Sequence, residues 1–243
     1  MVAGVGTFRW WAFVRLVHKI IGWGLLALVA SLVVAHFAWK HYESPEWTPV
    51  LQDRGVTVQS RKLSGTTVLH FKVQTRIGGN LNSAMSAMLD PGTCGEWFPG
   101  CTGERELQAW DPKSMSQVYF WLAGFEPPFD AREFILKMLV TPDAATKSVK
   151  VEFMAVPDAL PRNDCCFRVV DMHNIWRFSD AGPGKIDVEF RQAMDLQLPY
   201  FIVNRFAPRA LVELFADQLP HLLNKEKYRG IRHDFIDALS ASG

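Results

Sequence analysis

The sequence predicts an α+β fold in which a curved antiparallel sheet is closed by one long helix near the end of the chain. From about Phe120 to Met194, strand-forming runs follow one another and are separated by turn residues. The segment Pro199–Leu223 then shows the apolar period of a helix. A single helix laid across a curved sheet tends to enclose a space, which Phe, Met, Leu and Val side chains would line here.

The composition limits the class of protein. The chain has 243 residues, of which 49% are apolar and 12% aromatic, and this is enough for one domain with a core and an appendage. The net charge is +1, but residues 1–40 hold bases and no acid, so the remainder is mildly acidic. Nucleic-acid binding needs a basic face, and we therefore expect no nucleic-acid partner.

A membrane anchor is predicted near the N-terminus. Ile20–Ala38 carries no formal charge, and at about 1.5 Å per residue it nearly spans a hydrocarbon layer of roughly 30 Å. Bases precede this run, whereas only Lys40 follows it closely, which places the N-terminus in the cytoplasm. We expect a cytoplasmic segment (residues 1–19), a single transmembrane anchor (residues 20–39) in a bacterial-type inner membrane, and a domain on the periplasmic side.

A cleaved signal peptide is the alternative, and it would release the domain into the periplasm. Val33-Val34-Ala35 is a tolerable cleavage site. The apolar run continues past Ala35 and Trp39 follows it, which favours the uncleaved anchor. A buried core helix is disfavoured, because the segment is apolar all round and not along one stripe.

The cysteines allow one disulfide bond. Cys94 and Cys101 lie in a loop rich in Gly and Pro and could close a small ring. Cys165 and Cys166 fall on a predicted strand, where neighbouring side chains point to opposite faces, so no bond is expected between them. The spacings do not form two CxxC pairs, and we expect no zinc site and no other metal or cofactor.

The first elements of the domain follow a linker at residues 40–46, and the Pro-containing stretch Glu43–Asp53 is interpreted as linker and first turn. A hairpin and a short helix come next. They are predicted at Val56–Ser60 with Thr67–Thr75 for the hairpin, and at Leu81–Leu89, with Asn80 as N-cap, for the helix.

The later strands alternate apolar and polar side chains, as an antiparallel sheet with one wet face should. In the closing helix, Pro208 should produce a kink or a break. Residues 225–243 are interpreted as a polar tail with a weak amphipathic pattern over Ile231–Leu239. The strands are expected at Arg105–Ala109, Ser116–Ala123, Glu133–Thr141, Ser148–Val156, Cys165–Met172, Ile175–Ser179 and Lys185–Met194.

This order of elements resembles the START lipid-transfer domain, a member of the helix-grip superfamily (START/Bet v 1-like). The resemblance covers roughly Trp47 to Leu223 and gives a domain at residues 47–224. No single piece is specific, but their order and spacing together are. The pieces are Leu89-Asp90 with Glu96-Trp97, Gln117-Val118-Tyr119-Phe120, Pro127-Pro128-Phe129-Asp130-Ala131-Arg132-Glu133-Phe134, Phe167-Arg168, and Asp195-Leu196-Gln197-Leu198-Pro199-Tyr200-Phe201-Ile202-Val203-Asn204.

The resemblance implies a cavity for one lipid between the sheet and the last helix, with Pro157–Asp164 and the start of that helix at its mouth. Sterol-binding members often carry a buried arginine at the position of Met138, so a sterol is not specifically supported here. A lipid ligand, a membrane partner and a monomer are expected. The predicted ligand-binding residues are Phe120, Leu122, Phe134, Leu136, Met138, Phe153, Arg168, Val188, Phe190, Met194, Phe201 and Phe206.

Arg168 is the most informative polar residue of this set. It interrupts an apolar face of its predicted strand, and a buried guanidinium needs an acid, carbonyl groups or an anionic ligand group. It either contacts a lipid headgroup or lies at the sheet edge with its head in water.

Catalytic motifs such as G-x-S-x-G, H-E-x-x-H and a P-loop are absent from the sequence, so no catalytic residue is predicted. Binding and intermembrane transfer of one lipid is the expected function. An enzyme that uses the same cavity, of polyketide-cyclase-like or lipid-modifying type, is the alternative, and a lipid-responsive sensor is a third reading.

Overall fold

The computed structural model describes residues 6–97 and 100–241, and the chain forms two compact units. One unit consists of residues 1–43 with residues 63–67, and the other of residues 44–62 with residues 68–243. Each unit is described by itself.

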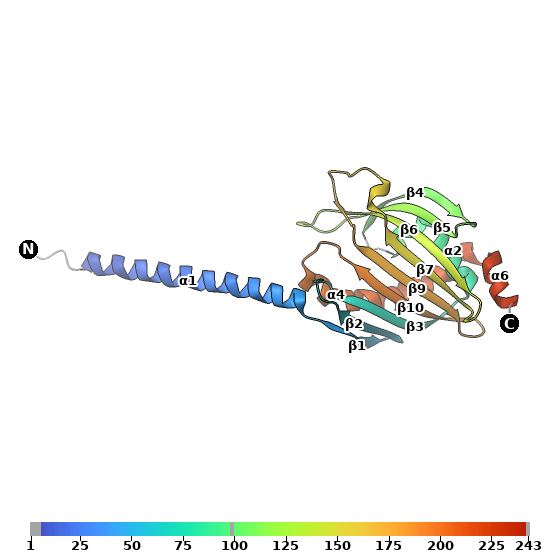
Figure 1. The fold of residues 1–243 in the computed structure, drawn as a ribbon, viewed down its shortest axis with the longest axis horizontal. Helices are drawn as coiled ribbons and strands as arrows, with labels where there is room; N and C mark the ends of the chain where they lie inside the picture. Colours follow the sequence, from blue (N-terminus) through green and yellow to red (C-terminus); the bar gives the residue numbers. More distant parts are fainter. Residues whose placement is uncertain (1–5, 98–99, 242–243) are drawn as a thin grey trace, which may run out of the picture. The chain divides into compact units, whose positions relative to one another are not determined.

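The first unit is built on α1 (Gly6–His41), the blue helix of Figure 1. Its stretch Phe13–His41 has a mean hydropathy of 2.2 and is long and apolar enough to cross a membrane. Its 36 residues extend over about 54 Å at ~1.5 Å per residue, more than a bilayer core of ~30 Å requires. A signal sequence near the N-terminus meets the same criteria of length and hydropathy.

The loop Leu63–Thr67 belongs to the same unit because it is hydrogen-bonded to the last turn of α1. The indole N–H of Trp39 donates to the Thr67 carbonyl over 2.8 Å, and the Gly65 N–H donates to the Lys40 carbonyl over 2.9 Å. The rings of Trp39 and Tyr42 stack with their centroids 6.0 Å apart. These contacts fix the last turn of α1 to the loop Leu63–Thr67.

The second unit contains a ten-stranded sheet in the order β1-β2-β3-β10-β9-β7-β6-β5-β4, with β8 paired to β6. The pairs along this path are antiparallel, and β8 joins β6 in parallel. The strands are β1 (Ser44–Asp53), β2 (Val56–Lys62), β3 (His70–Gly78), β4 (Cys101–Asp111), β5 (Ser116–Ala123), β6 (Arg132–Asp143), β7 (Ser148–Ala155), β8 (Phe167–Arg168), β9 (Met172–Asp180) and β10 (Lys185–Met194).

Two predictions about the strands were wrong. Glu43–Asp53 is not a linker, because Ser44–Asp53 forms β1 at the edge of the sheet, where Pro45 and Pro49 need not donate to an outer neighbour. The strand predicted at Cys165–Met172 is reduced to the short β8, and Cys165 lies in a turn.

Both pairs of cysteines form disulfide bonds. The bond between Cys94 and Cys101 confirms the predicted ring, with the two Cα atoms 5.9 Å apart. The bond between Cys165 and Cys166 contradicts the prediction that they stay apart. That prediction assumed an extended strand, whereas the two residues lie in a turn and a bend before β8.

Three short helices follow β3 along the chain: α2 (Leu81–Leu89), η1 (Pro91–Thr93) and α3 (Cys94–Trp97). Asn80 caps α2 as predicted. Its Oδ1 accepts from the Ser83 N–H over 2.9 Å, and the Ser83 hydroxyl accepts from the Asn80 N–H over 3.3 Å. This reciprocal capping box satisfies N–H groups that the first turn leaves unpaired.

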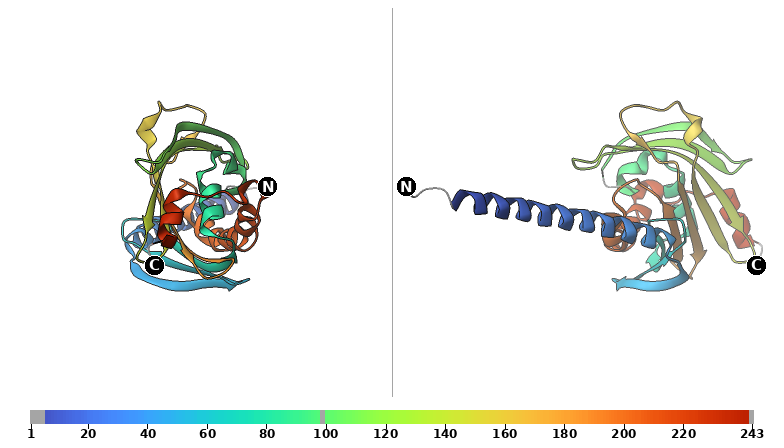
Figure 2. Two further views of the ribbon diagram at one scale, coloured as in Figure 1. Left: turned by 90° about the vertical axis from the view of Figure 1, so that its right-hand side faces the viewer. Right: turned by 60° about the vertical axis from the view of Figure 1, so that its left-hand side comes forward.

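The closing helix consists of α4 (Tyr200–Glu213), the π-helical segment η3 (Leu214–Gln218) and α5 (Leu219–Leu223), joined without a loop. A kink or a break was predicted at Pro208, and of these two the break is not found, because the helix continues through this residue. Instead, the backbone widens to i→i+5 bonding six residues later. Viewed end on, the sheet curves around α2 and this closing helix (Figure 2).

The predicted tail, residues 225–243, contributes to the core as far as the structure describes it. It contains η4 (Glu226–Tyr228) and α6 (Asp234–Ala241), and it buries Tyr228, Ile236 and Leu239. The compact unit therefore extends beyond the expected boundary at residue 224.

A buried ion pair fastens one loop to the sheet. Arg168 donates from Nε to Glu133 Oε1 over 2.7 Å, and its Nη atoms donate to the carbonyl groups of Pro157, Leu160 and Pro161. Four of the five guanidinium N–H groups thus have protein acceptors. Neither predicted environment of Arg168 is found, because its head is neither in water nor free for a ligand.

We predict that Ile236→Ala lowers the free energy of unfolding by about 2–5 kcal/mol, because it removes buried methyl groups and leaves a cavity. Ile231→Ala is the matched control in the same tail. Ile231 is 40% exposed, and the change should cost less than about 0.5 kcal/mol. Urea denaturation of the full chain followed by tryptophan fluorescence measures both. Equal, small effects would show that the tail does not stabilise the domain.

Arg168→Leu should destabilise the fold by about 3–5 kcal/mol, since it leaves the Glu133 carboxylate buried without a partner. Arg76→Leu is the control. Its partner Asp187 is solvent-exposed, so loss of this ion pair should change the stability little. Thermal unfolding of both variants distinguishes the two cases. A loss for Arg168→Leu no larger than for the control would contradict the role assigned to this pair.

Candidate functional site

A pocket of about 450 Å³ lies between one face of the sheet and the closing helix. Its volume is within the range of ~300–1,000 Å³ that is typical of sites for one small molecule. Strands β5, β6, β7, β9 and β10 form its wall, and α4 crosses it. Six of the twelve predicted ligand-binding residues line it, namely Phe134, Leu136, Phe153, Phe190, Met194 and Phe206.

On β5 the structure reverses the predicted orientation. Phe120 and Leu122 were expected to face the ligand, but Gln117, Tyr119 and Trp121 line the pocket. Phe120 lies on the other face, with its ring 5.7 Å from the guanidinium carbon of Arg105. The inward face of this strand carries polar and aromatic side chains instead.

The other four predicted residues do not line the pocket. Met138 and Val188 are fully buried in the core, and Arg168 is bonded to Glu133 as described. Phe201 is 66% exposed on α4. Large pocket residues were missed, above all Trp97, Trp121, Met172 and Trp176. The alternation on β9 carries a signal for two of these, because Met172 and Trp176 share a face with Phe178.

The inner end of the pocket is closed by an aromatic cluster. The Trp176 ring lies 5.6 Å from Trp97, 4.4 Å from Phe190 and 5.1 Å from Phe215, measured between centroids. These rings come from α3, two neighbouring strands and the closing helix. They bind the closing helix to the sheet at this end, so the pocket stops here.

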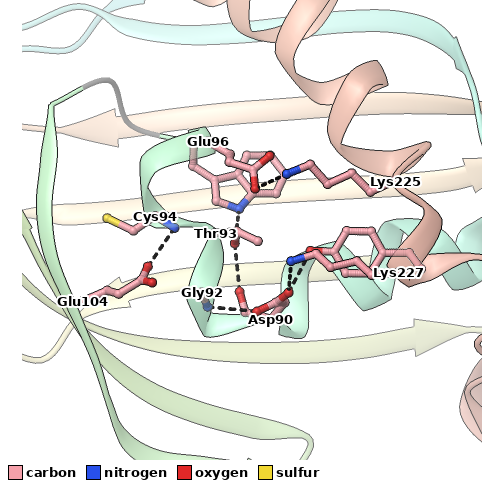
Figure 3. Close-up of polar contacts among 10 residues, drawn as sticks. Asp90, Gly92, Thr93, Cys94, Glu96, Glu104, Lys225 and Lys227 are labelled. Atoms are coloured by element: carbon pink, nitrogen blue, oxygen red, sulfur yellow. Dashed lines mark hydrogen bonds and ion pairs between the residues drawn. The ribbon is translucent and has the colours of Figure 1, made fainter.

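A polar network supports this inner end from behind (Figure 3). Asp90, which lines the pocket, accepts from Lys227 Nζ over 2.7 Å and from the Tyr228 hydroxyl over 2.9 Å. Burial alone would raise the pKa of Asp90, but hydrogen bonds from Lys227, Tyr228 and the Gly92 N–H outweigh it and lower the pKa. The carboxylate is therefore ionised and already neutralised by Lys227.

The same network ties the short helices to the end of the chain. Trp97 Nε1 donates to Thr93 Oγ1 over 2.8 Å, and Glu96 pairs with Lys225 (Figure 3). Glu104 accepts from the Cys94 N–H over 3.1 Å, next to the disulfide bond. These contacts hold the Trp97 ring in place at the pocket.

At the outer end, Arg132 joins the start of β6 to the segment that leads into α4. It is buried, and it donates to the carbonyl groups of Asp130, Leu196 and Gln197. Its guanidinium carbon lies 5.0 Å from the centre of the Phe167 ring. Burial lowers the pKa of Arg132, but the group stays cationic because guanidinium is a very strong base.

Large apolar side chains are exposed around this outer end. Phe201 and Phe206 project from α4. Phe167 and Val170, in and next to β8, are exposed as well. Two basic residues of α4, Arg205 and Arg209, are also exposed. We call this set the outer-end patch, which consists of Phe167, Val170, Phe201 and Phe206.

A transverse row of side chains crosses the inner face of the sheet, midway between the two ends of the pocket. The strand registers place Gln117, Met138, Phe153, Asn174 and Gln192 opposite one another on successive strands. Directly opposed residues in antiparallel pairs share a face of the sheet. We call its three polar members, Gln117, Asn174 and Gln192, the amide row.

Titratable side chains are few in this pocket. Among the described residues that line it, they are Asp90, Tyr119 and Glu213. Burial raises the pKa of Tyr119 well above its usual value, so its hydroxyl stays protonated. Glu213 is exposed on α4. The described lining contains no Lys, Arg or His.

No family model and no curated protein matches the sequence, but the fold is similar to solved structures. The STAR-related lipid transfer protein fragment from Xanthomonas axonopodis is 17% identical, with a TM-score of 0.64 over 74% of this chain and 99% of that one. Human StAR-related lipid transfer protein 5 is 17% identical, with a TM-score of 0.63 over 82% of this chain and 97% of that one. Human STARD10 is 15% identical, with a TM-score of 0.63 over 74% of each chain. The chain therefore has the fold of the START lipid-transfer domains, the helix-grip fold.

Proposed function

We propose that this protein binds one lipid molecule in the pocket and exchanges it with a membrane. The observation that carries the proposal is the pocket itself, which has a volume of about 450 Å³ and a wall of mostly aromatic and aliphatic side chains. The START fold around it supports a lipid as the occupant, because structures of this fold include proteins named for lipid transfer.

The energetics favour exchange over tight storage. Removing some hundreds of Å² of lipid tail from water is worth on the order of ten kcal/mol at ~25 cal/mol per Å². Against a bilayer the same burial is worth little, because the tail is already dry there. Loading and unloading are then nearly balanced, and the rate depends on how the outer end opens.

The enzyme alternative has less support. Acid–base chemistry requires a pair of titratable groups with suitable pKa values in reach of one substrate. Within the described lining, Asp90 is neutralised by Lys227, Tyr119 keeps its proton, and Glu213 is exposed. None of the three is a free buried group with a pKa suited to proton transfer, so we infer binding without chemistry.

The N-terminal helix fits a tether. We infer that α1 crosses an inner membrane once, with the N-terminus in the cytoplasm and the domain on the periplasmic side. The apolar length of Phe13–His41 and the bases that precede residue 20 support this topology. The tether confines the domain to one membrane surface. The outer-end patch offers it apolar groups, and the exposed Arg205 and Arg209 on α4 offer basic ones.

We predict that a photoactivatable lipid labels the pocket of the full chain in vesicles of phosphatidylcholine and phosphatidylglycerol. Ala207→Trp should reduce adducts on β5, β9 and α4, because Ala207 lines the pocket and the indole ring takes up part of the space. Ala144→Trp, in the exposed turn after β6, should leave them unchanged. Peptide mapping by mass spectrometry measures the adducts. Labelling confined to α1 in the unmodified chain would sink the proposal.

Phe201→Ser should slow lipid transfer from donor vesicles to acceptor vesicles by about tenfold. A Phe side chain buried in the bilayer is worth about 1.5–3 kcal/mol, and Phe201 is exposed beside the pocket without lining it. The amount of bound lipid at equilibrium should not change. Ile231→Ser is the control for loss of an exposed apolar residue elsewhere. Equal transfer rates for both variants would exclude a role of Phe201 in docking.

A further inference from the structure

The pocket contains polar atoms that its protein neighbours do not satisfy. Within the described residues, Gln117 Oε1, Gln192 Oε1 and Trp121 Nε1 are buried and have no hydrogen-bond partner. All three side chains line the pocket. Gln117 is only 1% exposed, and its amide nitrogen has only the weak acceptor Met138 Sδ, at 3.8 Å.

The positions of these atoms are systematic. Gln117 and Gln192 are the two ends of the amide row, which crosses the wall at one level. Asn174, between them, uses Oδ1 to accept from the Ala193 N–H over 3.3 Å. Trp121 lies four residues beyond Gln117 on β5, about 13 Å toward the outer end at ~3.3 Å per residue.

Apolar side chains surround this level on both sides. Trp176 and Phe190 lie inward of the row, and Met172 and Met194 lie outward of it on the same strands. A buried amide without a partner opposes folding, whereas a methionine or leucine here would not. Buried amides without a protein partner are expected where a ligand completes their hydrogen bonds.

The missing partners define the ligand chemistry. Gln117 Oε1 and Gln192 Oε1 are acceptors, so the group at the amide row must donate a hydrogen bond. Trp121 Nε1 is a donor, so an acceptor is required nearer the outer end. The described lining contains no base, Asp90 is already paired with Lys227, and Glu213 is exposed on α4. Neither an anionic nor a cationic group therefore finds a buried counter-ion at the amide row.

We propose that the pocket selects an uncharged lipid that carries a hydroxyl or a secondary amide between two apolar segments, and that the amide row binds this group. The inference rests on the proposed function, because it specifies the occupant of the same pocket. Gln117 is the principal contact for the donor group, and Trp121 binds an acceptor closer to the outer end. Gln192, at the other end of the row, provides a second acceptor of the same kind.

The test compares lipids that differ in one donor group. Methyl 12-hydroxyoctadecanoate is compared with methyl octadecanoate for the hydroxyl arm, and N-octyldecanamide with octyl decanoate for the amide arm. Each compound competes with a photoactivatable octadecane for the full chain in phosphatidylcholine nanodiscs, and intact mass measures the labelled fraction. The reporter has no polar group, so it reads occupancy of the pocket alone.

The unmodified chain should prefer the donor compound over its partner in at least one arm by about tenfold, the size of one buried hydrogen bond. Gln117→Met should remove most of this preference and leave labelling by the reporter unchanged. Gln108→Met, on the exposed side of β4, is the matched control and should keep the preference. Because all variants are tested with the same pair of compounds, the partition of these compounds into the nanodisc cancels when the variants are compared.

The possible failures are distinguishable. If the reporter labels the pocket but the unmodified chain shows no preference, or if Gln117→Met keeps it, the amide row does not select the ligand and only the proposed function stands. If the reporter does not label the pocket of the unmodified chain, lipid binding itself is wrong. Should Gln117→Met fail to take up the reporter, Gln192→Met decides the question from the other end of the row.

Discussion

The packing of the closing helix on the sheet is the constraint on which the rest of the structure depends. Its downstream half buries Leu211, Phe215, Leu219 and Leu222, and the Trp176 ring packs against Phe215. Residues 200–210 bury no side chain fully. They cross the pocket with Ala207 and Ala210 among its lining, where small side chains leave room. The downstream half of the closing helix thus stabilises the fold, and the upstream half leaves room for the pocket.

Charged groups at the ends of the pocket are used to hold backbone in place. Arg132 bonds the carbonyl groups that lead into α4, and Arg168 with Glu133 fastens the loop before β8. Asp90 joins the inner end to the last part of the chain. Since these charges are satisfied by the protein, the interior stays nearly neutral, and a ligand can enter without burying an unpaired charge.

Periodicity and turn chemistry predicted much of this fold because they are local properties. The bounds of α2, β5 and β10 agree with the structure to the residue, and the long closing helix is found where its apolar stripe indicates it. Segments whose structure depends on tertiary context were harder to predict. β1 contains two prolines and is a strand only because it lies at an edge. Cys165 and Cys166 are bonded because they lie in a turn and a bend, and the strand expected to include them begins only at Phe167.

The site was half predictable for a physical reason. In the core, an apolar residue faces inward because burial rewards it, so alternation identified Phe134, Leu136, Phe153 and Phe190. On β5 the same rule selected the wrong face, because that strand presents Gln117 to the pocket and Phe120 to the other side. Core packing does not explain a buried glutamine with an unpaired oxygen.

In a pocket that exchanges its ligand with a membrane, apolar area and polar contacts have different roles. Apolar area holds the lipid tail, and polar contacts distinguish one lipid from another. The aromatic and aliphatic wall offers a lipid tail nearly what the bilayer offers it, so this area distinguishes poorly between lipids of similar size. A hydroxyl or amide N–H has few partners in the hydrocarbon layer, and transfer to Gln117 Oε1 gives it one. A few amides on an otherwise apolar wall can therefore set selectivity without making release slow. An ionic contact of the same kind would hold its ligand more firmly and add the cost of desolvating a charge on each cycle.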